Sequence, residues 1–299
     1  MKVTRLEEVE QRPRRVAVGT FDGVHVGHRA VIEGSDTVLT FEPHPLAVVH
    51  PEALPKLLDT QSIKQDVIAT LGVEELVVIP FDREFAAHSA ADFVDQVLVA
   101  RLGATQVSVG ENFRFGAKAQ GDSDFLSTRE EFATRVVPLV DVDGETVSSS
   151  RIRALVYAGE VGRAAPLLGR PFLAEGTVVK GDQRGRELGM PTANMVPDDR
   201  LAHPGHGVYA AHAIVGGQSH PAAVSIGVRP TFESARGLLC ETHLIDFEGD
   251  LYGQTLRIAF LERLRGERRF DSVPALVEQM HADVRKAAQI AAAATVSGR

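Results

Sequence analysis

The sequence predicts an α/β domain with a parallel sheet, followed by an antiparallel β-barrel with a closing helix. First, the chain has 299 residues, more than one compact domain usually needs. Second, strand-like and helix-like segments alternate in the first half, which is typical of a parallel sheet wrapped by helices. Third, strand-like segments follow one another directly in the second half, as in a barrel or sandwich. We expect the domains at 1–170 and 171–299.

The first-half strands are short, nearly continuous apolar runs, as expected for strands covered on both faces. They are expected at 15–20, 37–41, 75–81, 105–110 and 134–140. Apolar residues at helical spacing predict helices over 62–71 and 89–102. For the second helix, Ser89 is the expected N-cap, Asp92 follows three residues later, and Gly103 ends it.

The second-half strands are separated by turn residues such as Gly216 and Gly217. We expect them at 174–181, 207–217, 219–227, 239–247 and 254–264. A helix with one apolar face is expected from about Ser272.

Composition excludes several classes of protein. The net charge of -8 disfavours general nucleic-acid binding. No apolar run reaches the length of a membrane span, and the N-terminus has no secretory h-region. The single cysteine, Cys240, excludes a disulfide framework within the chain and a CxxC metal site. We therefore expect a cytoplasmic protein.

The motif GTFDGVHVGH follows the first expected strand and leads into a helix. Open α/β sheets bind ligands at such carboxyl ends of strands. Gly23 and Gly27 allow a phosphate to approach the backbone, and the helix N-terminus offers free N–H groups. His25 and His28 share a face of the first turn, where imidazoles can donate to phosphate oxygens. The alternative interpretation is a glycine-rich turn with two solvated histidines.

Three other first-half motifs have a structural explanation as well as a functional one. Ser149, Ser150 and Arg151 open a helix and suit an anion, although an ordinary N-cap explains the same residues. The stretch ENFRFG is explained equally well as a functional loop and as a turn whose phenylalanines pack into the core. The stretch EPHP predicts a proline-fixed turn and leaves His44 only a minor candidate.

The stretch KGDQRGRELGMPTAN is the most informative part of the second half. Its glycines and arginines suit a loop that closes over phosphates, and they are Gly181, Arg184, Gly185, Arg186 and Gly189. Pro191 fixes the backbone before Thr192 and Asn194, whose side-chain oxygens point the same way on an extended segment. Such oxygens are the ligands that Mg²⁺ accepts beside phosphates. The alternative is a flexible turn that leads into a strand.

In this order, the motifs resemble those of the prokaryotic bifunctional riboflavin kinase/FAD synthetase family. GTFDGVHVGH is similar to the HxGH signature of the nucleotidyltransferase superfamily, and TFEPHP, VGENFRFG and VSSSRIR resemble the remaining adenylyltransferase motifs. KGDQRGRELGMPTAN resembles the riboflavin kinase signature, with Met190 where the family usually has phenylalanine. The resemblance covers essentially the whole chain. It implies a Rossmann-like nucleotidyltransferase domain and a riboflavin kinase barrel.

For the first domain, the resemblance implies that the FMN phosphate attacks the α-phosphate of ATP and that pyrophosphate leaves, giving FAD. His25 and His28 are then the catalytic histidines. Asn112 and Arg114 meet the flavin nucleotide or ATP. The ATP phosphates are held by Gly19, Thr20, Phe21, Asp22, Gly23, Gly27, Ser149, Ser150 and Arg151.

For the second domain, the resemblance makes Glu241 the general base that accepts the proton of the ribityl 5'-hydroxyl of riboflavin. It makes Thr192 and Asn194 the residues that bind Mg-ATP. Strand alternation places Glu241 and His243 on one face and Cys240 on the other, where Cys240 serves packing. ATP is the co-substrate of both domains, and Mg²⁺ the metal.

Three hypotheses follow. The leading one is a bifunctional enzyme that makes FMN from riboflavin and FAD from FMN, with small-molecule partners only, no nucleic acid or membrane, and a monomeric or weakly self-associating state. The second is a riboflavin kinase whose first domain has lost adenylylation, because the connection RAVIEGSD is shorter than the resemblance implies. The third is a non-catalytic flavin-binding or storage protein. Sixteen positions, 21–36, still allow a short crossover helix from Val26 to Glu33.

Overall fold

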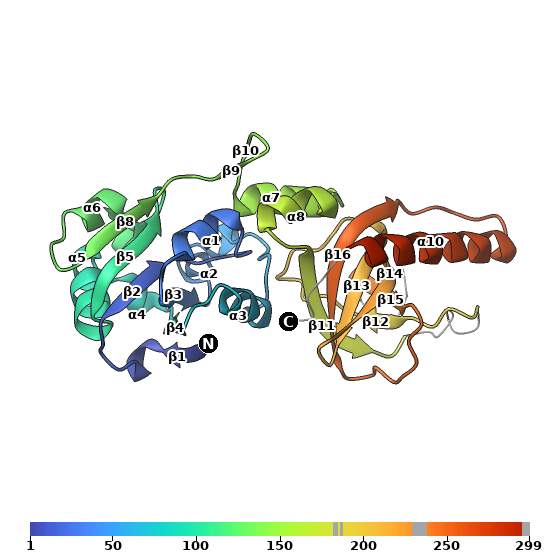
Figure 1. The fold of residues 1–299 in the computed structure, drawn as a ribbon, viewed down its shortest axis with the longest axis horizontal. Helices are drawn as coiled ribbons and strands as arrows, with labels where there is room; N and C mark the ends of the chain where they lie inside the picture. Colours follow the sequence, from blue (N-terminus) through green and yellow to red (C-terminus); the bar gives the residue numbers. More distant parts are fainter. Residues whose placement is uncertain (182–184, 186–187, 229–237, 295–299) are drawn as a thin grey trace. The chain divides into compact units, whose positions relative to one another are not determined.

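The structure, a computed structural model, describes residues 1–299 except 182–184, 186–187, 229–237 and 295–299 (Figure 1). Arg184, Arg186 and Arg229 therefore lie outside the described residues. The chain forms two compact units. One contains Met1–Pro55 and Lys64–Ser148, and the other contains Lys56–Ile63 and Ser149–Arg299.

The first unit contains a six-stranded parallel sheet with the order β1-β4-β3-β2-β5-β8. Its strands are β1 (Lys2–Arg5), β2 (Arg14–Val18), β3 (Thr37–Glu42), β4 (Glu75–Pro80), β5 (Ala104–Gly110) and β8 (Ala133–Val137). The five strands expected from apolar runs are confirmed, and β1 is an additional edge strand. The chain runs outward from β2 through β3 to β4 and then returns to the other side of β2. The gap between the ends of β2 and β5 is therefore the switch point of the sheet.

Short helices connect these strands (Figure 1). They are α1 (Val26–Ile32), α2 (Pro45–Val49), α3 (Gln61–Ala69), α4 (Arg83–Ala86), α5 (Ala90–Asp92), α6 (Ser123–Ser127), η1 (Leu6–Glu8), η2 (Pro51–Ala53), η3 (Phe93–Arg101) and η4 (Ala117–Ala119). The smaller strands pair as β6 (Arg114–Phe115) with β7 (Gly121–Asp122), and β9 (Asp141–Val142) with β10 (Glu145–Thr146). The helix expected over 89–102 begins with the capping box of Ser89 and Asp92, but continues as a π-helix from Phe93.

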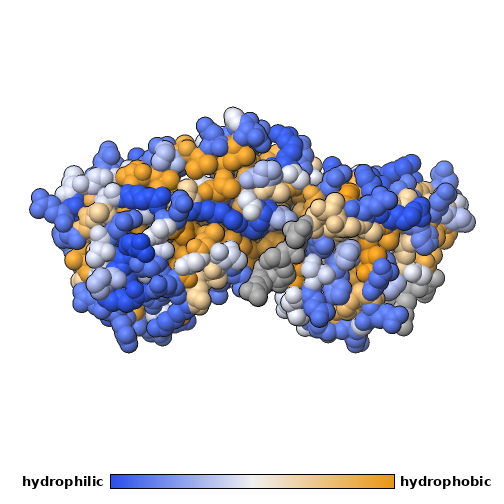
Figure 2. Space-filling model, in the orientation of Figure 1, coloured by the Kyte–Doolittle hydropathy of each residue, from blue (hydrophilic) through white to orange (hydrophobic). Residues whose placement is uncertain are grey.

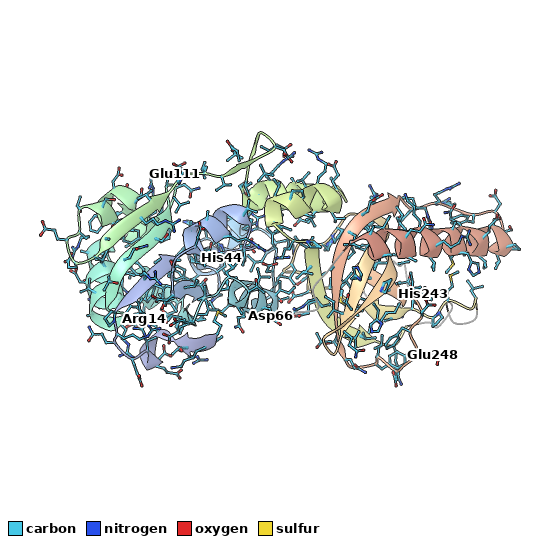
Figure 3. The ribbon with its side chains drawn as sticks, viewed as in Figure 1. Arg14, His44, Asp66, Glu111, His243 and Glu248 are labelled. Carbon is cyan, nitrogen blue, oxygen red and sulfur yellow. The ribbon has the colours of Figure 1, made fainter. Side chains whose placement is uncertain are left out.

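The core of the first unit lies between the sheet and its helices. It is built from β-branched residues of the strands and from phenylalanines, including Phe93 and Phe115. At the edge of the core, the Glu75 carboxylate accepts hydrogen bonds from Thr4 Oγ1 at 2.9 Å and from Arg14 Nη2 at 3.0 Å. The Arg14 side chain, labelled in Figure 3, is only 1% exposed, so this ion pair joins the start of β2 to β4 within the buried region.

The second unit contains a closed barrel with the order β11-β12-β15-β14-β13-β16, and every pair of neighbours is antiparallel. Its strands are β11 (Phe172–Val179), β12 (Ala193–Met195), β13 (Gly207–Val215), β14 (Gln218–Val228), β15 (Leu238–Leu244) and β16 (Thr255–Arg265), and its helices are α7 (Ser149–Tyr157), α8 (Val161–Leu168) and α10 (Val273–Ala293). The expected barrel and closing helix are confirmed. Ser272 caps α10, which packs on β13, β14 and β16.

Two parts of the chain come before the barrel in the sequence but belong to the second unit because of their contacts. Helices α7 and α8 pack on each other, and α8 packs on β11 and β16. In Lys56–Ile63, the Asp59 carboxylate pairs with Arg170 at 2.5 Å, and Thr60 Oγ1 donates to Glu175 at 3.1 Å. The boundary between the two compact units thus falls after Ser148. The first strand of the barrel, β11, begins later, at Phe172, and the expected boundary was near residue 170.

The surface carries charged and polar residues with smaller apolar areas between them (Figure 2). Among the described residues, the large apolar side chains left exposed are Met1, Val3, Val49, Val136, Leu139, Tyr157, Val196, Tyr252 and Val273. In the same part of the chain, no helix combines the length and the apolar character needed to cross a membrane.

Candidate active sites

The turn after β2 has an unusual backbone conformation. Phe21, Gly23 and Val24 have φ angles of 49°, 90° and 40°. The left-handed region suits glycine but is strained for a β-branched residue such as Val24, which is fully buried. Strain of this kind persists where the surrounding structure enforces it, and it is common at functional sites. The turn delivers the chain directly into α1.

His25 and His28 come together at the start of α1. His25 is the N-cap, and its Nδ1 accepts the backbone N–H of His28 at 3.2 Å. The two rings stack with centroids 3.5 Å apart and planes at 15°, which confirms that they share a face of the first turn. A Cβ at Gly27 would lie 3.2 Å from the His25 ring, so the glycine of HxGH makes room for this ring.

The electrostatics of the pair keep His28 neutral. Burial lowers the pKa of His28 well below 6.5, and the neighbouring charges of His25 and Lys64 lower it further. The Nδ1 atom of His28 is buried and has no hydrogen-bond partner among the described residues. A polyanion bound here would reverse the balance, because an opposite charge favours the protonated ring.

Lys64 is a member of this site that the sequence analysis missed. It is buried on α3, and its Nζ donates to the carbonyl oxygen of Thr20 at 2.9 Å. Thr40 Oγ1 donates to the same oxygen at 3.3 Å. A lone lysine in an amphipathic helix gives no sequence signal, since only the fold brings α3 beside the turn after β2.

The loops after β3 and β5 reach the same edge of the sheet as the HxGH turn, because all three strands are parallel neighbours. The loop after β5 holds the two expected nucleotide-binding residues, Asn112 and Arg114, and both side chains are exposed. Arg114 pairs with Asp122 at 3.6 Å across the β6–β7 hairpin. After β3, His44 (Figure 3) caps α2 by accepting the backbone N–H of Leu46 at 3.2 Å, which is a structural role.

The Ser149, Ser150 and Arg151 motif opens α7, as expected for the start of a helix. Ser149 and Arg151 are partly exposed, and Ser150 is exposed. Ser150 Oγ accepts a hydrogen bond from Arg153 at 3.3 Å, which keeps a second guanidinium beside this helix end.

In the barrel, strand register brings the kinase motif and the expected base together. Asn194 on β12 lies directly opposite Glu241 on β15, and Ser225 on β14 lies opposite Glu241 on its other side. Glu241 and His243 are partly exposed, whereas Cys240 and Thr242 are buried, which confirms the expected alternation. Burial raises the pKa of Cys240 to about 12, as expected for a packing residue.

Two of the glycines before PTAN, Gly181 and Gly185, are required by close contacts. A Cβ at Gly181 would lie 2.3 Å from Asn194 Nδ2, and one at Gly185 would lie 2.4 Å from the carbonyl oxygen of Met190. The N–H of Met190 donates to Gly185 at 2.8 Å, and its side chain is buried. Gly181 and Gly185 therefore leave room for Asn194 and for the Met190 carbonyl, respectively.

His243 is a second residue whose role the sequence analysis did not identify. Its Nδ1 lies 2.8 Å from the carbonyl oxygen of Pro191, so a proton on Nδ1 is donated to that oxygen and links the PTAN segment to β15 (His243 is labelled in Figure 3). The expected pattern placed His243 beside Glu241, but its backbone partner is visible only in the fold.

The donor set beside Glu241 fits a magnesium ion carried by a nucleotide. Asn194 Oδ1 is buried and has no hydrogen-bond partner among the described residues, so it is available as a ligand. Thr192 adds a hydroxyl, and Mg²⁺ typically takes one or two protein oxygens together with phosphate oxygens and water. The part of the chain that the structure describes contains no group of three or more His, Cys, Asp or Glu side chains that could hold a metal ion.

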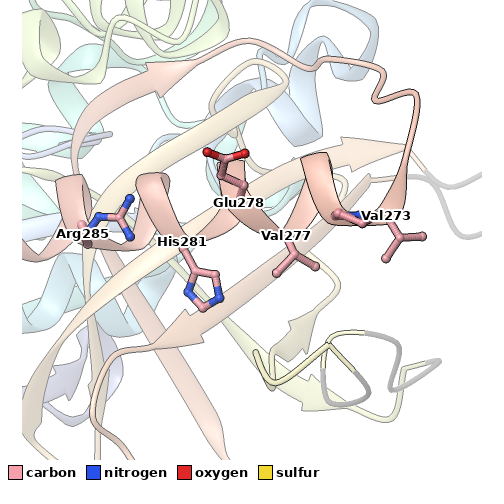
Figure 4. A pocket seen from close by; sticks show the side chains of 6 residues that line it. Val273, Val277, Glu278, His281 and Arg285 are labelled. Atoms are coloured by element: carbon pink, nitrogen blue, oxygen red, sulfur yellow. The ribbon is translucent and has the colours of Figure 1, made fainter.

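A surface pocket lies elsewhere on the second unit, along α10 (Figure 4). Its lining residues are Val273, Pro274, Val277, Glu278, His281 and Arg285. None of them belongs to either of the two candidate sites described above.

Fold and sites together define a chain with two phosphate-handling units, one of the nucleotidyltransferase type and one a kinase-type barrel. The FAD synthetase family matches residues 7–151, and the riboflavin kinase family matches residues 168–291. The chain belongs to the bifunctional riboflavin kinase/FMN adenylyltransferase family.

Relatives match over nearly their whole length. The bifunctional riboflavin kinase/FMN adenylyltransferase of Pseudomonas fluorescens is 37% identical, with 95% of this chain and 94% of that protein covered. The Escherichia coli K12 protein of the same name is 35% identical, with 95% and 96% covered. A crystal structure described as a macrolide-efflux protein from Streptococcus pneumoniae superposes with a TM-score of 0.85 at 29% identity, covering 95% of this chain and 98% of that one.

Proposed function

We propose that the second unit phosphorylates riboflavin to FMN and that the first unit adenylylates FMN to FAD, with ATP as co-substrate in both steps. The observation that carries this function is the presence of both family matches on one chain. The shortened connection does not favour a lost adenylyltransferase, because α1 still crosses between the parallel strands β2 and β3 and still presents His25 and His28.

In the first unit, the FMN phosphate oxygen attacks the α-phosphate of ATP and pyrophosphate leaves, so no protein nucleophile is needed. The work of the site is alignment and charge neutralisation. His25 and His28 donate to the phosphate oxygens, and uptake of a proton by His28 adds to the charge of Lys64. The turn residues 19–23 and Gly27, together with the side chains of Ser149, Ser150 and Arg151, are proposed to bind the remaining phosphate oxygens.

Selection of the flavin nucleotide is assigned to the loop after β5. Asn112 and Arg114 are exposed on that loop at the switch point of the sheet, where open α/β sheets bind ligands. For Arg114 to meet a phosphate, it exchanges its pairing with Asp122 for the ligand.

In the barrel, the 5'-hydroxyl oxygen of riboflavin attacks the γ-phosphate of ATP, the bond from the γ-phosphorus to the bridging oxygen breaks, ADP leaves, and Glu241 accepts the hydroxyl proton. Thr192 and Asn194 would hold the Mg²⁺ that accompanies ATP, which would supply positive charge beside the phosphates. Gly181, Gly185 and Gly189 are proposed to contact the phosphates, whereas Arg184 and Arg186, expected in the same stretch, lie outside the described residues. His243 keeps PTAN in place through Pro191.

The proposal includes a cytoplasmic location and a monomer or weak homo-oligomer that acts on small molecules. The single cysteine is buried, which suits a protein without structural disulfides.

Paired variants test the assignment of the two reactions. Glu241→Ala should abolish FMN formation while FAD formation from supplied FMN continues. His28→Ala should slow FAD formation strongly while FMN formation stays near wild type. Both products are measured by chromatography from the same preparation, so each reaction controls for folding of the chain. Equal loss of both reactions in either variant would argue against two separate sites.

A further inference from the structure

The carboxyl end of α1 has a complete set of hydrogen bonds that the proposed chemistry does not use. Within the chain segment itself, Arg29 O accepts the N–H of Glu33 at 2.9 Å, and Ile32 O accepts the N–H of Ser35 at 2.9 Å. Helix ends leave their last carbonyls without intrahelical partners, so the remaining acceptors of this turn need donors from elsewhere.

Those donors are two side chains from neighbouring strands. Arg135 on β8 donates from Nη2 to Ala30 O at 3.1 Å and from Nη1 to Glu33 O at 2.7 Å. Ser108 on β5 donates from Oγ to Val31 O at 2.7 Å, and Arg135 Nη1 lies 3.4 Å from the same Oγ. The guanidinium and the hydroxyl thus form one connected group beneath the helix end.

This arrangement matters because α1 has only seven residues and contains a glycine. A helix so short is not stable by itself and depends on tertiary contacts. A cation at the carboxyl end is favourable for the helix dipole. The same helix has His25 as its N-cap and His28 in its first turn, so its position decides where both imidazoles lie.

We propose that Arg135, supported by Ser108, is a positioning residue for adenylylation that holds α1 where His25 and His28 meet the phosphates. The inference rests on the proposed adenylylation of FMN. Arg135 contacts the helix backbone and acts through the two histidines, without touching the reacting atoms. A small displacement of catalytic groups is enough to slow a reaction whose catalysis is mostly alignment.

The test compares Arg135→Ala with Arg101→Ala in the full chain. Arg101 is a matched control because it also donates to backbone carbonyls of the first unit, those of Leu6 and Glu7, but away from α1. At a temperature where both variants are folded, Arg135→Ala should lower kcat for FAD formation by about 10- to 100-fold. Arg101→Ala should keep a near-wild-type kcat, and both should phosphorylate riboflavin normally. Arg135→Lys should recover part of the loss.

Hydrogen exchange provides a readout that does not depend on activity. Amides of residues 26–33 should exchange about tenfold or more faster in Arg135→Ala, and not in Arg101→Ala. Unchanged exchange, unchanged kcat, or an equal loss of kcat in both variants would overturn the positioning role. If the wild type makes no FAD, the proposed adenylylation is wrong, and the exchange comparison alone decides whether Arg135 fixes the helix.

Discussion

Gly181→Ala should impair riboflavin phosphorylation, because the new methyl group collides with the proposed magnesium ligand. Its Cβ would lie 2.3 Å from Asn194 Nδ2 and 2.6 Å from Asn194 Cγ. The closer separation is shorter by roughly 1 Å than ordinary contact distances of about 3.5 Å, so a group must move by about that amount. Asn194 lies on a barrel strand, and misplacing a positioning group by about 1 Å costs up to about 100-fold in rate.

The assay measures initial rates of FMN formation from riboflavin and Mg-ATP, with FAD formation from supplied FMN as the control for folding. Gly162→Ala is the matched variant, because its Cβ would lie 3.4 Å from Leu261 O, an ordinary contact. We expect kcat/KM for phosphorylation to fall by about 10- to 100-fold in Gly181→Ala only, with partial recovery at high Mg²⁺. A wild-type rate in Gly181→Ala would refute the placement of Asn194 in the site.

Three further predictions concern stability and reactivity. The pKa of His28 in the folded protein lies below its unfolded value of 6.5, so the unfolded state binds more protons below pH 6.5. The free energy of unfolding should therefore fall by up to about 1.4 kcal/mol per pH unit as the pH drops below 6.5. In urea unfolding followed by circular dichroism, His28→Gln should flatten this slope. Glu75→Gln should destabilise the first unit by about 3–5 kcal/mol in the same experiment, since it leaves the buried Arg14 charge without its carboxylate; a loss below about 1 kcal/mol would contradict this. Cys240 should resist iodoacetamide at pH 8 in the native protein, and Cys240→Ser should keep both activities, whereas fast alkylation would show that the thiol is accessible.

Local patterns in the sequence predicted much of the fold. Apolar runs located five of the six strands of the parallel sheet, and Ser272 marked the start of α10. The strand β1 was missed because it has four residues and only one apolar side chain, Val3, which is exposed. The Lys56–Ile63 segment also could not be assigned, since its grouping with the barrel depends on ion pairs such as Asp59–Arg170 between distant parts of the chain.

The candidate sites, like the fold, contain some features that local sequence patterns predict and others that depend on tertiary contacts. Stacking of His25 and His28 follows from helical spacing, and the opposite faces of Cys240 and Glu241 follow from strand alternation. The pairing of Asn194 with Glu241 depends on barrel register, which motif spacing does not reveal. Lys64 and Arg135 escaped notice because their partners are backbone carbonyls supplied by other elements.

The most direct measurement is a time course of the wild-type protein with riboflavin and Mg-ATP. If both units act as proposed, FMN should rise first and FAD should follow, with release of pyrophosphate. FMN that accumulates without FAD, even when FMN is supplied at high concentration, would show that the first unit does not adenylylate. The absence of FMN would contradict the kinase assignment of the barrel.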